Sequence, residues 1–115
     1  MTVDVGAERF GELVADALDE IPEKLARLMD NVAVVVDNTS PPGGLLGLYE
    51  GIPLTERFEY GGMALPDRIT VFRRAICSSC SDEAEVVEQV RVTVVHEVAH
   101  HFGIDDDRLA DLGWA

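Results

Sequence analysis

The segment from Ser81 to Gly103 constrains the fold of this chain more than any other part of the sequence. Ser81 or Asp82 can cap the start of a helix, and Gly103 can adopt the left-handed conformation that ends one. Between these ends, valines recur at helical spacing and form one apolar face: Val87, Val90, Val94, Val95 and Val98. The pattern therefore predicts a long helix that ends at about Phe102 and packs against a core.

The same helix carries the motif His96-Glu97-Val98-Ala99-His100, which has the spacing of a metal site. Residues four apart lie about 40° apart around a helix axis, so His96 and His100 project side by side and can bind one ion. Glu97 points about 100° away from His96, close enough to hold a water on that ion without itself being a ligand. The motif thus indicates a metal site with a general base.

A third ligand is expected just after the helix, because catalytic zinc takes three protein ligands and keeps a fourth position for water. Gly103 ends the helix, and the chain can turn back so that Asp106 faces the two histidines. Asp106 is therefore the predicted third ligand, while Asp105 caps the short helix that follows. His101 lies about 140° from His96 around the helix axis, which places it outside the predicted ligand set.

The segment from His96 to Asp106, with the sequence His-Glu-Val-Ala-His-His-Phe-Gly-Ile-Asp-Asp, resembles the zincin metallopeptidases that use aspartate as the third ligand. Upstream, residues 47–57, 65–73 and 90–95 resemble the small bacterial family of minimal zincin-like proteins, formerly a domain of unknown function. The resemblance covers nearly the whole chain.

This resemblance implies a fold and a chemistry. The implied fold is α+β and zincin-like, with a short mixed β-sheet packed against helices and the metal motif on a long helix in the C-terminal half. The implied site holds Zn²⁺ on His96, His100 and Asp106, with Glu97 as the catalytic base for hydrolysis of peptide bonds. The resemblance does not specify a substrate.

Other helices are predicted from apolar spacing. An amphipathic helix runs from Val5 to about Leu18. A short helix from Pro22 to about Met29 is expected to bury Leu25 and Leu28, as well as Met29 itself. A last short helix after Asp105 carries Leu109 and Leu112.

Three strands are predicted from β-branched and alternating patterns. The run Val32–Asp37 is expected to be a central strand, buried on both faces. Leu45–Tyr49 and Ile69–Ile76 are the other two, and Arg68 beside the last is expected to form an ion pair. The turn-forming residues Thr39–Gly44 predict a loop that can hang over a site.

Length and charge limit the classes of function. The chain has 115 residues, enough for the single domain 1–115 but not for two domains. Nine Lys and Arg against 22 Asp and Glu give a net charge of −13, which repels phosphate backbones and anionic lipids. The longest aliphatic run, Val32–Val36, is too short to span a bilayer, and no signal-peptide pattern is visible. We therefore expect an acidic, cytoplasmic protein that binds neither nucleic acid nor membrane.

Two further groups of residues have possible chemistry. Cys77 and Cys80 have the spacing of redox thiols and zinc knuckles, but the chain offers neither a second ligand pair nor a βαβ context. We expect them to be structural thiols that can form a local disulfide on oxidation. Tyr49, Tyr60 and His101 are the candidates for stabilising an oxyanion beside the metal.

Several functions are compatible with these residues. The first is a zinc-dependent peptidase acting on a peptide or protein, which could add as an extended strand at Leu45–Tyr49 or at Ile69–Arg73. The second is a metal-binding module with an inactive zincin site, which binds a protein partner through its acidic surface. A metal-dependent ribonuclease is disfavoured by the net charge and by Glu97.

Two points stay open in the sequence. The ligand set of two histidines and an aspartate also suits iron, manganese or cobalt. The motif histidines can alternatively be ordinary core or surface residues of a valine-rich helix.

Overall fold

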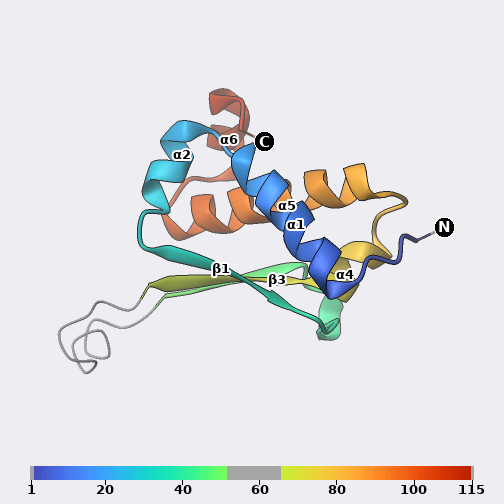
Figure 1. Ribbon diagram of the computed structural model, residues 1–115. Coiled ribbons are helices and arrows are strands. Elements are labelled where there is room, and N and C mark those ends of the chain that lie inside the picture. Colours follow the sequence, from blue (N-terminus) through green and yellow to red (C-terminus); the bar gives the residue numbers. More distant parts are fainter. Residues whose placement is uncertain (1, 52–65, 115) are drawn as a thin grey trace, which may run out of the picture.

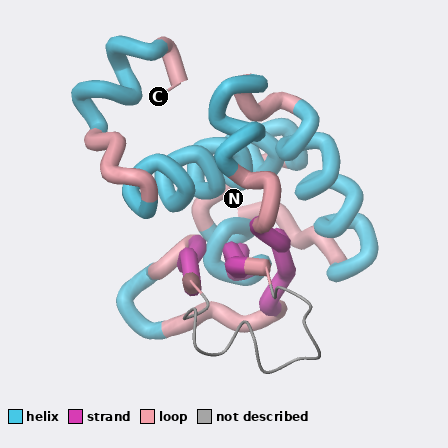
Figure 2. Tube along the Cα trace, turned by 90° about the vertical axis from the view of Figure 1, so that its left-hand side faces the viewer, coloured by secondary structure: helices cyan, strands magenta, loops and turns pink. Residues whose placement is uncertain are grey.

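The computed structural model describes residues 2–51 and 66–114 of the chain. The fold of these residues is α+β, with one small mixed β-sheet and the two long helices on one of its faces (Figure 1). Figure 2 shows the strands nearly end-on, with the long helices stacked above them. The expected fold class is thus confirmed. Residues 52–65 lie outside the described residues, and so does Tyr60, one of the candidates for stabilising an oxyanion.

The motif helix is α5 (Glu83–His101), as the capping and valine patterns predict. At its start, the Asp82 carboxylate accepts a hydrogen bond of 2.8 Å from the backbone N–H of Glu85. At its end, Gly103 has a φ of 76°, the left-handed conformation that favours glycine. Its core-facing residues are Val86, Val90, Thr93, Val94, Val95, Val98 and Ala99.

The sheet contains β1 (Val32–Asp37), β2 (Gly47–Glu50) and β3 (Asp67–Phe72) in the order β1-β3-β2. β1 pairs with β3 in parallel, with Val34 opposite Ile69, and β2 pairs with β3 antiparallel, with Tyr49 also opposite Ile69. The central strand is therefore β3, in which Ile69 and Val71 are fully buried. β2 lies at one edge of the described sheet.

The prediction that Val32–Asp37 is a central strand buried on both faces is wrong. In the sheet that the structure describes, β1 lies at an edge, and Val35 is 38% exposed. The long helices cover one face of the sheet, so alternate residues of β1 pack on the core while their neighbours face away from it. A run of β-branched residues signals a strand but does not signal its position in the sheet.

The predicted strand Ile69–Ile76 is also corrected. β3 ends at Phe72, and the chain turns directly into the helix α4 (Arg73–Ser78). The Arg73 guanidinium donates hydrogen bonds to Asn38 Oδ1 at 2.8 Å and to the carbonyl of Val5 at 2.7 Å. These contacts hold the chain at the point where it leaves the sheet, so that the following helical turn buries its apolar residues in the core.

The loop predicted at Thr39–Gly44 contains the single turn η1 (Pro42–Gly44). Its flanking residues are tied to the start of α4, because Asn38 accepts from Arg73 and the carbonyl of Leu46 accepts from the N–H of Phe72. Figure 1 places this region away from the end of α5 that carries the motif. The loop does not hang over the predicted site.

The remaining helices complete the core. α1 (Ala7–Asp19) contacts α5 and buries Phe10, Leu13, Val14 and Ala17. α2 (Glu23–Leu28) buries Leu25, whereas Leu28 is 38% exposed, contrary to expectation. α6 (Asp106–Leu112) buries Leu109. None of the helices in the described ranges is long and apolar enough to cross a membrane.

Candidate metal centre

The junction between α5 and α6 brings two of the predicted ligands together. His100 Nε2 lies 3.1 Å from Asp106 Oδ1, and both side chains are more than half exposed. A tetrahedral zinc ion with bonds of about 2.0–2.1 Å separates its ligand atoms by roughly 3.3 Å. The observed separation is therefore close to the one that a shared zinc ion requires.

His96 lies one helical turn before His100, and the centroids of the two rings are 5.9 Å apart with the planes tilted by 45°. Within residues 2–51 and 66–114, no three His, Cys, Asp or Glu side chains are grouped closely enough to hold a metal ion. The structure thus brings His100 and Asp106 within hydrogen-bonding distance and leaves the ring of His96 one helical turn away. Two imidazoles and a carboxylate are donors that fit zinc.

The turn that positions Asp106 is built from backbone contacts. The N–H of Ile104 donates to the carbonyl of Ala99 at 2.8 Å, which closes the end of α5 around Gly103. The Asp105 carboxylate accepts a hydrogen bond of 2.9 Å from the N–H of Arg108 and caps α6, as predicted. Because Asp105 takes the capping role, the carboxylate of Asp106 is free to face His100.

Glu97 is half-buried on the side of α5 that faces β2. A Cβ atom added at Gly47 would lie 3.9 Å from Glu97 Cγ and only 2.5 Å from Thr93 Cγ2. The backbone of β2 therefore passes directly over this side of the helix. In the part of the chain that the structure describes, the Glu97 carboxylate makes no side-chain hydrogen bond or ion pair, which leaves it available to act as a base.

His101 does not join the ligand pair. Its ring stacks on the ring of Tyr49, with centroids 3.9 Å apart and planes 14° apart. The Tyr49 hydroxyl donates a hydrogen bond of 2.7 Å to Asp67 Oδ2, and His101 Nε2 lies 3.9 Å from the same oxygen. Tyr49 and His101, considered above as oxyanion stabilisers, are thus engaged with each other and with Asp67.

Asp67 was not predicted as a functional residue from the sequence. Its position at the start of an apolar strand, where a carboxylate is buried only if it has partners, was a signal that could have found it. The prediction for its neighbour was right, since Arg68 forms an ion pair of 2.9 Å with Glu50.

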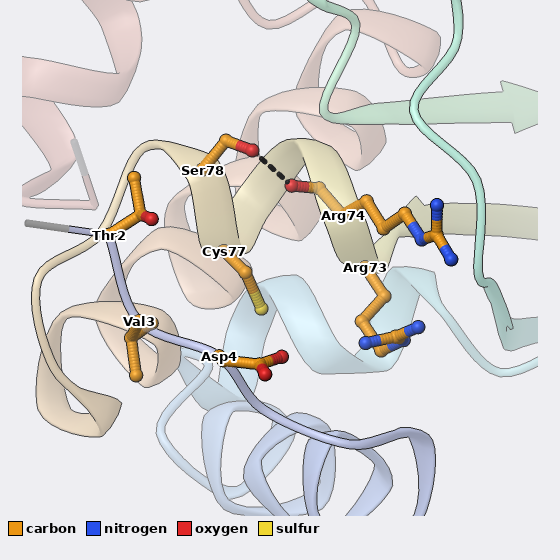
Figure 3. Close-up of a pocket in the computed structure, with 7 residues that line it drawn as sticks. All are labelled: Thr2, Val3, Asp4, Arg73, Arg74, Cys77 and Ser78. Carbon is orange, nitrogen blue, oxygen red and sulfur yellow. Dashed lines mark hydrogen bonds between the residues drawn. The ribbon is translucent and has the colours of Figure 1, made fainter.

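The two cysteines lie away from the motif and are buried as free thiols. Burial raises the pKa of both Cys77 and Cys80, which disfavours the reactive thiolate. Cys77 lines a cavity of about 360 Å³, and none of the motif residues lines it. Figure 3 shows Cys77 there, between the N-terminal segment and α4. The expectation of structural thiols fits this burial, and disulfide formation on oxidation stays a prediction.

A family model described as zincin-like metallopeptidase matches residues 29–114, which include the whole sheet, α5 and α6. The chain therefore belongs to the zincin-like metallopeptidase family. A similar solved structure is a conserved hypothetical protein from Thermo thermophilus, with 26% identity and a TM-score of 0.54. That match covers 93% of this chain and 99% of the other. Comparison with curated proteins returns no match.

Proposed function

We propose that this protein is a zinc-dependent peptidase in which His96, His100 and Asp106 hold the metal and Glu97 is the catalytic base. The observation that carries the proposal is the 3.1 Å approach of His100 Nε2 to Asp106 Oδ1, one turn away from His96, in a chain of the zincin-like family. The Glu97 carboxylate, which has no side-chain hydrogen bond or ion pair among residues 2–51 and 66–114, lies on the same turn of α5 and supports the proposal further.

The chemistry divides between metal and protein. A zinc ion bound by these residues would supply a Lewis acid that polarises a peptide carbonyl and acidifies a water molecule. Glu97 accepts the proton of the attacking water and then donates it to the leaving amine. Its half-buried position against β2 holds the carboxylate close to where a substrate backbone can lie.

A substrate peptide is expected along β2. In the described sheet β2 is an edge strand next to Glu97, so an extended peptide can add to it through backbone hydrogen bonds. The other segment considered from the sequence, Ile69–Arg73, is unsuitable because β3 is paired on both sides. The proposed partner is thus an extended or unfolded polypeptide.

The first prediction compares two glutamates on the same helix. Glu97→Gln should retain about one zinc per chain but lose roughly 10²–10⁴-fold of the peptidase activity, because the base is gone and the ligands remain. Glu88 is an exposed residue of the same helix, so the control variant Glu88→Gln should retain both the bound zinc and the peptidase activity. Zinc content and cleavage of unfolded casein are measured side by side.

The outcomes separate the two candidate functions. Equal cleavage by wild type and Glu97→Gln would contradict the role of Glu97. Zinc binding without cleavage by any variant would favour the metal-binding module with an inactive site. A wild-type protein that binds no zinc would exclude the metal centre.

A further inference from the structure

One side of α5 lies against β2 along its C-terminal half. Thr93, Glu97 and His101 are four residues apart, so they line a single stripe of the helix. Gly47, at the start of β2, meets Thr93 and Glu97, while Tyr49 in the same strand stacks on His101. β2 therefore contacts the stripe on both sides of Glu97.

The contact of β2 with Thr93, one turn before Glu97, depends on the absence of a side chain at Gly47. A Cβ atom at Gly47 would lie 2.5 Å from Thr93 Cγ2, which is too close, and 3.2 Å from the carbonyl oxygen of Thr70, which is tight. Glycine thus allows the strand backbone to approach the helix closely at this point.

The contact after Glu97 is made by three side chains from three elements. The parallel stack of Tyr49 on His101 joins β2 to the last residue of α5. The Tyr49 hydroxyl is in turn held by Asp67, the first residue of β3, whose side chain is only 13% exposed. The backbone just after β2 adds to the contact, because a Cβ at Gly51 would lie 3.6 Å from His101 Cε1.

We propose that Tyr49, Asp67 and His101 form a clamp that positions the metal-binding end of α5. The proposal rests on the proposed function. His101 directly follows the ligand His100, and Glu97 lies one turn earlier on the stripe that the clamp holds against β2. The three residues act through their neighbours: fixing the ring of His101 fixes the last turn of α5, from which His100 and Glu97 project. They are positioning residues, not ligands.

The clamp predicts that zinc affinity depends on the Tyr49 ring. Outer partners that orient metal ligands typically contribute about 10–100-fold to metal affinity or activity. Tyr49→Leu should therefore weaken zinc binding at least about 10-fold and lower kcat with little change in KM. Tyr49→Phe keeps the stack on His101 and loses only the hydroxyl bond to Asp67, so its zinc affinity should lie between those of wild type and Tyr49→Leu. Val35→Ala, an exposed position on the other edge strand, is the control and should match wild type.

Zinc affinity is measured by competition with a chelator, at a temperature where the metal-free form of every variant is folded. A purely structural role would lower the melting temperature of the metal-free protein while leaving zinc affinity and the ratio of kcat to KM at their wild-type values. If Tyr49→Leu does not fold, His101→Ala removes the same stack from an exposed side chain, and the same loss is expected.

Each remaining outcome decides one of the two proposals. Wild-type zinc affinity in Tyr49→Leu, or in His101→Ala where it replaces that variant, overturns the clamp even if the protein is an active peptidase. Weakened zinc binding in a protein that never cleaves peptides supports the clamp and rejects the peptidase. A wild-type protein that binds no zinc rejects both.

Discussion

Asp105 and Asp106 are adjacent carboxylates whose contacts assign them different tasks. Asp105 caps α6 through the N–H of Arg108, and Asp106 faces His100. We expect Asp105→Ala to cost about 1 kcal/mol of unfolding free energy, the usual value of a lost helix cap, and to leave zinc binding intact. Asp106→Ala should leave the unfolding free energy nearly unchanged but weaken zinc binding. The loss should exceed the roughly 10–100-fold that is typical when a residue that only orients a metal ligand is removed.

Urea denaturation of the metal-free proteins and chelator competition separate these two effects. The neighbouring Asp107→Ala is the control, because Asp107 is exposed and no hydrogen bond or ion pair of its side chain is found in the described structure. If Asp105→Ala weakened zinc binding as much as Asp106→Ala, the assignment of the third ligand would be wrong.

Gly47 and Gly11 provide a matched comparison of elements. A Cβ at Gly47 in β2 would overlap Thr93 Cγ2, whereas a Cβ at Gly11 in the middle of α1 meets nothing within 4 Å. Gly47→Ala should therefore lower the unfolding free energy by about 1–3 kcal/mol, as overpacking does. Gly11→Ala should raise it by about 0.5–1 kcal/mol, because alanine favours a helix interior over glycine.

The measurement is urea denaturation, and a second substitution identifies the cause. Thr93→Ser removes the methyl group that Gly47→Ala would meet, so the double variant should recover part of the lost stability. Equal destabilisation in the presence and absence of that methyl group would contradict the close approach of β2 to α5.

The elements were predictable to the extent that their signals are local. The cap at Asp82, the valine spacing and the stop at Gly103 all lie within or directly beside α5, and the helix forms where they indicate. Strand order is not a local property. The valine run of β1 carries the same β propensity at an edge as at a centre, and its place is set by which strand pairs with β3.

At the scale of the whole molecule, the same distinction applies to the candidate site. His96, Glu97 and His100 lie within a few residues of each other, so one helix and one turn suffice to predict their proximity. The contact of Tyr49 with His101 depends on where β2 docks on α5, and the contact with Asp67 depends on the register between β2 and β3. Such long-range geometry leaves no periodic pattern in the sequence.

Arg9 and Glu83 connect α1 to the start of α5, 74 positions apart in the chain. Arg9 Nη2 lies 2.9 Å from Glu83 Oε1, and hydrogen bonds from Arg9 hold the pKa of Glu83 below its ordinary value of 4.5. The unfolded chain lacks this contact, so in acid it binds more protons than the folded chain. The contribution of Glu83 to stability is therefore complete above its unfolded pKa and is lost as the pH falls through the lowered folded value.

The corresponding test is the unfolding free energy of wild type and Glu83→Gln between about pH 7 and about pH 3. Wild type should be the more stable by a small, constant amount near neutral pH, small because both side chains are about half exposed. The difference should shrink as the pH falls below 4.5, since Glu83 is then protonated and resembles glutamine. When Arg9 is also replaced by Met, the change in unfolding free energy caused by Glu83→Gln should no longer show this decrease in acid. A difference that stayed constant down to the lowest pH would show that Arg9 does not stabilise the charged form of Glu83.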